Sequence, residues 1–240
     1  MSKPIKISKR LNLDNLPKHI AIILDGNGRW ATRRGLPRNL GHKAGCENLK
    51  KILNHILDLG INSTTLFLFS TENWKRPQDE IDGIFNIVKD YLVDEENDLV
   101  KNGVKVVVSG DYTKLPNNLV ESIDKILTKT KSCDKRMLNL AINYGGRDEI
   151  MRAVNKAIEQ GKTSLTENEF EKLLYSCEMP PLDFVIRTSG EMRLSNFMLW
   201  QIAYSELYFT RTLWPDFSPK ELQAALIDYQ HRRRRFGNVN

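Results

Sequence analysis

The segment covering residues 19–30, HIAIILDGNGRW, constrains the fold of this chain more than any other. Residues 20–24 form a continuous apolar run, which is typical of a strand covered on both faces of a sheet. Asp25 follows directly, at the end of the strand where open α/β sheets bind their ligands. A Gly-Asn-Gly turn then lets backbone amides approach an anion, and Arg29 adds a positive charge as the next helix begins. The segment therefore predicts a site for a metal ion and a diphosphate.

Apolar strand-like runs alternate with segments of helical periodicity, which is typical of a mostly parallel sheet flanked by helices. The expected strands cover residues 20–24, 64–69, 104–108, 137–142, 183–187 and 205–209. The expected helices carry apolar stripes within residues 49–57, 81–92, 119–127, 150–158 and 170–174, and a last helix begins near Ser218 with a capping box. At 240 residues the chain is long enough for one α/β domain. We predict a single α/β domain over residues 19–237, with a mostly parallel six-stranded sheet, preceded by a flexible N-terminal segment, residues 1–18.

Polar residues follow the second, fourth and fifth expected strands. They cover residues 70–74, 143–147 and 187–191. If the strands are parallel, these loops meet Asp25 at one edge of the sheet and bring several arginines near a shared metal and anion site. The alternative, that they are ordinary strand-ending turns, stays open.

The positive charge of the chain is concentrated at one place. The formal net charge is +6, and removing the four consecutive arginines at 232–235 reduces it to +2. A surface for duplex nucleic acid needs charge spread along a face, so we expect no nucleic-acid partner. The arginine run fits either a phosphorylated small molecule or a solvated helix end.

The three cysteines and the apolar segments bear on the compartment. Cys46, Cys133 and Cys177 form no close pair, so neither a disulfide framework nor a zinc site is indicated and a reducing compartment is favoured. No segment approaches the ~20 apolar residues of a membrane span. We expect a soluble, cytoplasmic protein.

The glycine turn also fits the dinucleotide-binding pattern G-x-G-x-x-G/A over residues 26–31. That reading needs an acidic residue about 20 residues later at the end of the second strand. Glu47 lies at that distance but falls in a helical stripe, and Asp25 would repel a pyrophosphate unless a cation lay between them. An oxidoreductase using a nicotinamide or flavin cofactor remains an alternative.

Three further residues have both structural and functional interpretations. His42, with Arg38 four residues before it, is either a helix-capping side chain or a donor to the anion site. Trp74 either covers the next helix or lines the site. Glu206, within a strand of apolar and aromatic residues, is costly to bury unless it is paired or bound to a metal.

Several motifs together resemble those of the cis-prenyltransferases, most closely the bacterial undecaprenyl diphosphate synthases. They are DGNGRWA, GHKAG, FSTENWKRP, NYGGR, RTSGE, RLSNF, LWQIAYSELYF, WPDF and the terminal RRRRFG, and the resemblance extends over nearly all of residues 19–237. The resemblance implies a fold with an apolar product tunnel, in which residues 19–237 form the catalytic domain. Candidate tunnel walls lie around Ile84, Phe85, Val88, Leu92, Leu138 and Leu140, and each of these also fits ordinary core packing.

The resemblance further implies an activity and its partners. The activity is sequential cis (Z) condensation of isopentenyl diphosphate with an allylic diphosphate, commonly farnesyl diphosphate, to give a long-chain product such as undecaprenyl diphosphate, the precursor of the lipid carrier for cell-wall polysaccharides. Mg²⁺ is the implied cofactor and a homodimer the implied assembly. Transient membrane contact would accompany release of the lipid product.

The same resemblance assigns residues to the site. It implies catalytic roles for Asp25 and Asn73, and a metal site formed by Asp25 and Glu206. The substrate-binding residues that it implies are Gly26, Asn27, Gly28, Arg29, Trp30, Arg38, His42, Ser70, Thr71, Glu72, Trp74, Arg76, Arg187, Arg193, Leu194, Ser195, Arg235 and Gly237, the last two reaching the site of the partner subunit.

Two positions depart from the family pattern. Met192 stands where related bacterial sequences often carry histidine, which weighs against a metal ligand there. Arg136 stands where the family often has a bulky apolar residue near the tunnel floor, which bears on product length. A non-catalytic subunit of the same fold is the second alternative function, but such a subunit is expected to lack the Asp25 carboxylate.

Overall fold

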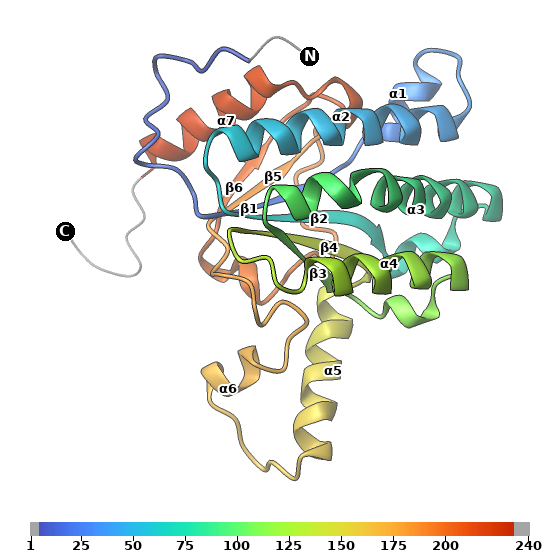
Figure 1. Cartoon of the computed structure of the whole chain (residues 1–240), viewed down its shortest axis with the longest axis vertical. Coiled ribbons are helices and arrows are strands. Elements are labelled where there is room, and N and C mark those ends of the chain that lie inside the picture. The colour runs from blue at the N-terminus through green and yellow to red at the C-terminus, as the bar shows by residue number, and fades with distance from the viewer. Residues whose placement is uncertain (1–4, 233–240) are drawn as a thin grey trace.

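The computed structural model describes residues 5–232. Six strands form one parallel sheet in the order β3-β4-β2-β1-β5-β6 (Figure 1). The strands are β1 (His19–Ile23), β2 (Ser63–Ser70), β3 (Val104–Ser109), β4 (Arg136–Tyr144), β5 (Phe184–Arg187) and β6 (Glu206–Phe209). The predicted α/β class and the number of strands are therefore confirmed, and every strand pair is parallel.

Seven α-helices accompany the sheet. They are α1 (Asn27–Thr32), α2 (Arg38–Asp58), α3 (Gln78–Lys101), α4 (Asn117–Thr130), α5 (Gly146–Glu159), α6 (Glu167–Glu171) and α7 (Pro219–His231), and the described residues also include short 3₁₀ turns η1 (Thr71–Lys75), η2 (Tyr112–Lys114), η3 (Gln201–Tyr204) and η4 (Trp214–Asp216). Ser218 caps α7 by accepting the Glu221 N–H, as the sequence predicts.

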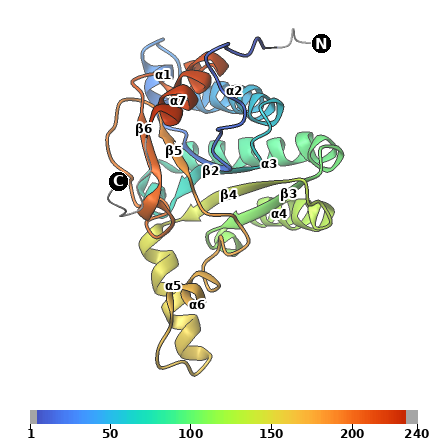
Figure 2. The same ribbon diagram turned by 90° about the vertical axis from the view of Figure 1, so that its left-hand side faces the viewer.

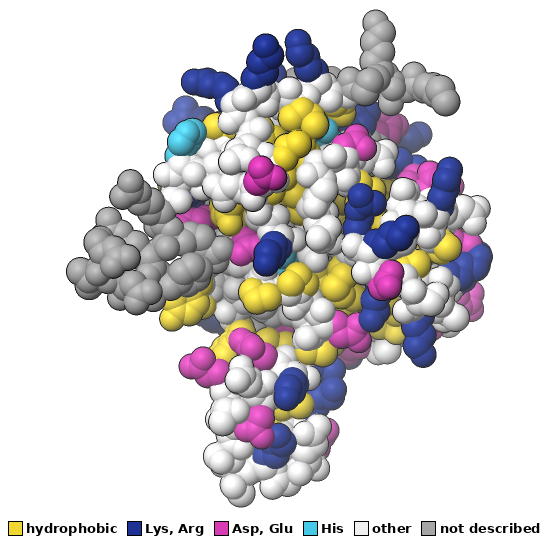
Figure 3. All heavy atoms as spheres, turned by 60° about the vertical axis from the view of Figure 1, so that its left-hand side comes forward, with side chains coloured by type: hydrophobic (Ala, Val, Ile, Leu, Met, Phe, Trp, Pro, Cys, Tyr) yellow, Lys and Arg dark blue, Asp and Glu magenta, His cyan; other side chains and the backbone are white. Residues whose placement is uncertain are grey.

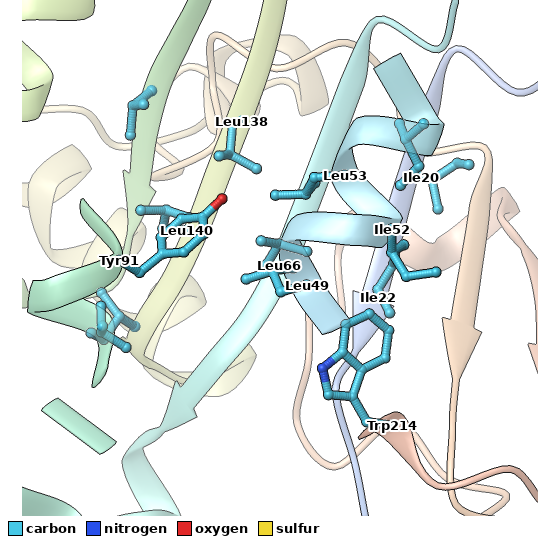
Figure 4. Close-up of a cluster of buried hydrophobic side chains, with 14 of the residues drawn as sticks. Ile20, Ile22, Leu49, Ile52, Leu53, Leu66, Tyr91, Leu138, Leu140 and Trp214 are labelled. Carbon is cyan, nitrogen blue, oxygen red and sulfur yellow. The ribbon is translucent and has the colours of Figure 1, made fainter. Parts of the chain in front are cut away.

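Alternation along the strands gives the sheet two different cores. Ile20 and Ile22 of β1 pack with α2, α3, α4 and α7 in the larger core, part of which is drawn in Figure 4. Ala21 and Ile23 point to the other face, where Phe197 and Met198 pack in a smaller core. Both faces of the central strand are thus covered, which explains the unbroken apolar run of β1.

Helices α5 and α6 project away from the sheet in both ribbon views (Figures 1 and 2). They pack on each other through a small core of their own that includes Ala153, Phe170 and Leu174. Met151 and Ile158 on α5 are exposed. This arm therefore presents apolar side chains to solvent in the single chain.

The segment before β1 differs from the prediction. Residues 1–18 are expected to be flexible, but residues 5–18 lie along α7. The Ser8 N–H donates to Gln223 Oε1 at 2.7 Å, and the side-chain amide of Gln230 donates to the Asn12 carbonyl. Leu11 is buried in the larger core. Side-chain amides on α7 hold this segment in place, a pattern that the N-terminal residues themselves do not reveal.

All six expected tunnel-wall residues are buried in the larger core, and the apolar product tunnel stays a prediction. Val88 and Leu92 pack in the larger core, the part of the molecule in which Figure 4 shows Leu138 and Leu140. Of the expected wall residues, Ile84 alone lines the large cavity described below.

Candidate active site

Asp25 lies two residues beyond β1 and is held between two arginines from different elements. Its Oδ2 accepts a hydrogen bond from Arg187 Nη2 at 3.0 Å, and its Oδ1 lies 3.2 Å from Arg29 Nη2. The Asp25 backbone carbonyl accepts hydrogen bonds from the Thr188 hydroxyl at 2.6 Å and from the Trp214 N–H at 3.0 Å. Both the backbone and the carboxylate of this residue are therefore fixed in place.

The charge state of Asp25 follows from this environment. Burial raises the pKa of its carboxyl, but hydrogen bonds from Arg187 and Ser189 and the charge of Arg29 outweigh burial and lower the pKa below its ordinary value. Asp25 is therefore a carboxylate at neutral pH. An ionised oxygen donor at the end of a central strand is the kind of ligand that Mg²⁺ prefers.

Gly26 makes the turn after Asp25 possible. Its φ of +112° lies in the region that side chains disfavour, and a Cβ atom there would approach Leu213 Cδ2 to 2.9 Å. The chain then enters α1, which packs closely on α2. A Cβ atom on Gly41 would lie 2.0 Å from the Asn27 carbonyl oxygen, so the glycine of the GHKAG motif is required for this helix contact.

A second arginine group forms where β5 ends. Arg187 is 4% exposed and donates to Ser195 Oγ at 2.8 Å and to the Arg193 carbonyl. Glu191 pairs with both Arg193 and Arg29, at 2.5 and 3.0 Å. Ser189 and Ser195 have positive φ angles of 82° and 49°, which non-glycine residues rarely adopt. Such backbone strain is concentrated at functional sites in many proteins.

A third group forms around Glu80, at the start of α3. This buried carboxylate accepts hydrogen bonds from Arg38 and Arg76 and lies 3.2 Å from His42 Nε2. Burial lowers the pKa of His42, and this outweighs the raising effect of Glu80. His42 is therefore neutral at neutral pH, and Nε2 carries the proton that faces the carboxylate.

One cavity joins the three groups. Its volume is about 440 Å³. The expected site residues that line it are Asp25, Gly26, Asn27, Gly28, Arg29, Arg38, His42, Ser70, Asn73, Arg76, Arg187, Arg193 and Ser195. Phe67, Leu68, Phe69 and Ile84 supply apolar wall. The cavity thus combines cationic and apolar surface at the carboxyl ends of β1, β2 and β5, the central strands of the sheet.

The loop after β2 is held by a reciprocal capping box. The Ser70 side chain accepts the Asn73 N–H, and Asn73 Oδ1 accepts the Ser70 N–H at 3.1 Å. The Asn73 amide oxygen is therefore engaged by the backbone, whereas no protein acceptor within residues 5–232 is recorded for its NH₂ group. Trp74 donates to Asn143 Oδ1 at 2.8 Å and packs edge-on against Phe69.

Five expected substrate-binding residues do not line the cavity. Trp30 donates to Asp216 at 2.7 Å, and Leu194 packs in the smaller core. Glu72 accepts from the Asn196 amide at 2.8 Å and is near Thr71, and Trp74 lies against Phe69 and Phe85. Within this chain these side chains support the cavity rather than face it.

Within this chain the structure separates Glu206 from Asp25, the two residues expected to form the metal site, and their shared role stays a prediction. Glu206 begins β6 and is in register with Phe184 and hence with Ile20, near the start of β1. Five residues along a strand correspond to roughly 16 Å. Glu206 accepts a hydrogen bond from Arg232 Nη1 at 3.0 Å. The expected strands already imply this separation, because Asp25 follows the end of residues 20–24 and Glu206 lies at the start of residues 205–209, so the resemblance alone places the two acids in one metal site.

The remaining expected positions are two C-terminal residues and the two departures from the family pattern, Met192 and Arg136. Arg235 and Gly237 lie outside the described residues. Met192 is 79% exposed. Arg136 donates to the Leu57 carbonyl at 3.2 Å and, with Leu138, lines a small separate cavity of about 30 Å³ at the end of α2.

Glu80 lies outside the sequence motifs, whereas Thr188, Ser189 and Glu191 lie in the RTSGE motif but have no role assigned by the resemblance. Glu80, Ser189 and Thr188 bind the expected arginines or the Asp25 backbone, and Glu191 links two arginines. Ser189 and Glu191 lie in the predicted loop after β5, so their position was a signal. Glu80 has no such signal, because an acidic residue in the first turn of a helix is common.

The donor set fits a metal ion that is shared with a phosphate ligand. Within residues 5–232 no cluster of three or more His, Cys, Asp or Glu side chains is arranged to hold a metal. Mg²⁺ usually binds through one or two carboxylates together with substrate phosphates and water. The single ionised Asp25 carboxylate beside the arginine groups matches this mode and does not match a cage made entirely of protein ligands.

The dinucleotide alternative loses its structural support. Glu47 lies within α2, and α1 contains only six residues. No acidic residue ends β2 to hold a ribose, since Ser70 occupies that position.

Among the described helices, none is long and apolar enough to cross a membrane.

Sequence comparisons match nearly the whole chain. The family model described as "Putative undecaprenyl diphosphate synthase" matches residues 23–237. An isoprenyl transferase from Fusobacterium nucleatum subsp. nucleatum is 51% identical over 225 residues, covering 94% of this chain and 97% of the relative. An isoprenyl transferase from Clostridium tetani is 48% identical over 244 residues, covering 99% and 96%.

Two solved structures share the fold at moderate sequence identity. Lavandulyl diphosphate synthase from Lavandula x intermedia, in complex with dimethylallyl diphosphate, superposes with a TM-score of 0.88 at 34% identity, covering 93% of this chain and 99% of that one. A probable undecaprenyl diphosphate synthase from Campylobacter jejuni gives a TM-score of 0.78 at 36% identity, covering 93% and 100%.

Proposed function

The chain belongs to the undecaprenyl diphosphate synthase family of isoprenyl transferases, as its motifs predict, and we propose that it condenses isopentenyl diphosphate units onto an allylic diphosphate in the cis configuration. Farnesyl diphosphate is the proposed starter and undecaprenyl diphosphate the proposed product. One observation carries the proposal: the ionised Asp25 lies between arginines in a cavity that is lined by both arginines and apolar side chains.

Two diphosphates side by side carry several negative charges, which explains why one cavity contains so many arginines. The proposed allylic diphosphate lies at Gly26, Gly28 and Arg29, with Arg38 and His42 at its side. The proposed isopentenyl diphosphate lies at Arg187, Arg193 and Ser195. The two groups meet at Asp25, which contacts both Arg29 and Arg187.

Mg²⁺ is the proposed metal, because one carboxylate and a diphosphate provide hard oxygen ligands. Asp25 would hold it, and the metal supplies charge neutralisation for the leaving diphosphate. Glu206, which pairs with Arg232 in this chain, would contribute only to a site completed elsewhere, such as at a subunit contact.

The proposed reaction breaks the allylic C–O bond and forms a C–C bond to the terminal carbon of the isopentenyl unit. The isopentenyl unit then loses a proton to the released diphosphate, a step that Asn73 is proposed to assist. Negative charge grows on the departing diphosphate, and arginines already in place stabilise it without reorganisation. Asn73 is proposed to orient the isopentenyl unit through its NH₂ group, since an amide is not itself a base. Phe69 and Ile84 exclude water from the allylic carbon chain.

A homodimer is the proposed assembly. Among the described residues, β6 is an outer strand of the sheet, and its side chains are half-buried. Nearby, Tyr204 is 73% exposed. Exposed Met151 and Ile158 on α5 add apolar surface. In the proposed dimer, Arg235 and Gly237 reach the isopentenyl site of the partner subunit, and product release involves brief contact with a membrane.

One assay tests the proposed function. The purified chain is incubated with Mg²⁺, farnesyl diphosphate and labelled isopentenyl diphosphate, and the extracted lipids are sized. We expect long-chain cis-polyprenyl products that disappear with a chelator, and Asp25→Ala should reduce turnover by about 1,000-fold or more because the leaving group loses its support. Binding of a nicotinamide cofactor without any prenyl product would instead favour the oxidoreductase alternative.

A further inference from the structure

Glu80 is a buried acid that touches three of the expected substrate-binding side chains. It is 5% exposed, and its Oε2 accepts from Arg38 Nε at 2.9 Å. Its Oε1 accepts from Arg38 Nη2 at 3.3 Å and Arg76 Nη1 at 3.0 Å and lies 3.2 Å from His42 Nε2. A buried carboxylate is costly unless it is paired, and here three side chains from two segments share it.

Glu80 leaves most of the arginine donors free. A guanidinium carries five N–H donors. Glu80 accepts two hydrogen bonds from Arg38 and one from Arg76. Three N–H donors of Arg38 and four of Arg76 therefore remain for a ligand. A carboxylate that competed with the substrate would occupy the donors that the substrate needs. The count therefore favours an anchor that stays bound while a diphosphate enters.

The position of Arg38 shows what the anchor controls. Its guanidinium lies over Gly28, where a Cβ atom would come within 2.6 Å of Cζ. Arg38 is otherwise a long and exposed side chain, with 54% of its side-chain surface accessible. The bidentate contact with Glu80 fixes the plane of the guanidinium and aims its remaining edge at the glycine turn.

We propose that Glu80 is a positioning residue that holds Arg38, His42 and Arg76 in the orientation in which they bind the diphosphate of the allylic substrate. This inference rests on the proposed function of the same cavity. Glu80 does not touch the substrate and acts through the three side chains. It also ties the start of α3 to α2, so the cation group and the apolar wall at Ile84 move together.

The test compares Glu80→Gln with Glu96→Gln. Glu96 is a matched control, because it is a buried acid on the same helix that pairs with Lys125 and Lys129 away from the cavity. Calorimetry measures the affinity for inorganic diphosphate, and steady-state assays measure KM for farnesyl diphosphate. Glu80→Gln should lower the affinity for diphosphate and raise the KM for farnesyl diphosphate, each by about 10- to 100-fold, with a smaller change in kcat. This is the effect of losing a charge-assisted hydrogen bond. Glu96→Gln should leave both unchanged.

A double-variant cycle distinguishes positioning from general stability. If Glu80 acts through Arg38, adding Glu80→Gln to Arg38→Gln weakens binding little beyond Arg38→Gln alone. Full additivity, or unchanged or tighter diphosphate binding in Glu80→Gln, would overturn the inference. Thermal unfolding confirms that each variant is folded. Because diphosphate binding is measured without turnover, a wild-type protein with no prenyl product would refute the proposed function and leave this test intact.

Discussion

Gly28 determines where the Arg38 guanidinium lies. A methyl group at this position would overlap Cζ and Nη2 of Arg38, each 2.6 Å away, and the flexible arginine would have to move. We predict that Gly28→Ala folds with equal or slightly greater stability, because alanine favours a helix by up to about 1 kcal/mol. KM for the allylic diphosphate should rise about tenfold, the effect of one lost hydrogen bond to a charged group. Steady-state kinetics and thermal unfolding check both parts, and an unchanged KM would show that Arg38 does not bind the diphosphate.

At the scale of residues, the sequence reveals the cavity side chains that follow strands. Asp25, Ser70 and Arg187 come directly after or at the end of apolar runs, so their convergence follows from a parallel sheet alone. Glu80 is different, because its contacts depend on how α2 and α3 pack. Glu206 lies at the start of its strand, as the expected strand 205–209 implies, so its role in a metal site rests on the resemblance alone.

At the scale of elements, strand positions could be predicted to within two residues because each strand is a short apolar run. The N-terminal segment and the tunnel could not be. Residues 5–18 are held by glutamines on α7 more than 200 positions away in the chain. The helical stripes of α2 and α3 are the same whether the two helices pack tightly or leave a channel, so their sequences do not decide between the two.

The junction of α2 and α3 also predicts a dependence on pH. Burial raises the pKa of Glu80, but hydrogen bonds from Arg38 and His42 and the charge of Arg76 outweigh burial. The net effect lowers the pKa below its value in the unfolded chain. On acidification, Glu80 therefore takes up a proton in the unfolded chain at a higher pH than in the folded chain. The stability that ionised Glu80 contributes is complete above about pH 4.3 and is lost as pH falls through the lowered pKa. Urea unfolding of wild type and Glu80→Gln between pH 3 and pH 6 tests this. The variant should be less stable at pH 6 and should lose less stability on acidification; parallel curves would contradict the assignment.

At the scale of the whole molecule, β5 connects the cavity to the outer strand β6. β5 carries Arg187 and pairs with β6, the outermost strand. On the face in Figure 3, Lys and Arg side chains are interspersed with Asp and Glu. Charge is thus mixed on this surface, whereas the cavity gathers arginines.

The carboxyl-terminal residues provide a test at this scale. The last described helix ends at His231, and Arg232 is tied to Glu206 and Asp228. We predict that a chain ending after Arg232 unfolds at the same temperature as wild type. Its turnover should fall by about 100-fold or more, because it lacks the two residues proposed to complete the partner's site. Equal steady-state rates would refute that role, and sedimentation shows whether the dimer persists.

Asp25, just beyond the end of β1, is proposed to hold the departing diphosphate through a divalent ion. A crystal structure with Mg²⁺ and a non-reactive thiodiphosphate analogue of farnesyl diphosphate would show this contact. We expect the headgroup at residues 26–29, with the metal between it and the Asp25 carboxylate. A diphosphate bound elsewhere, or a metal that does not contact Asp25, would contradict it.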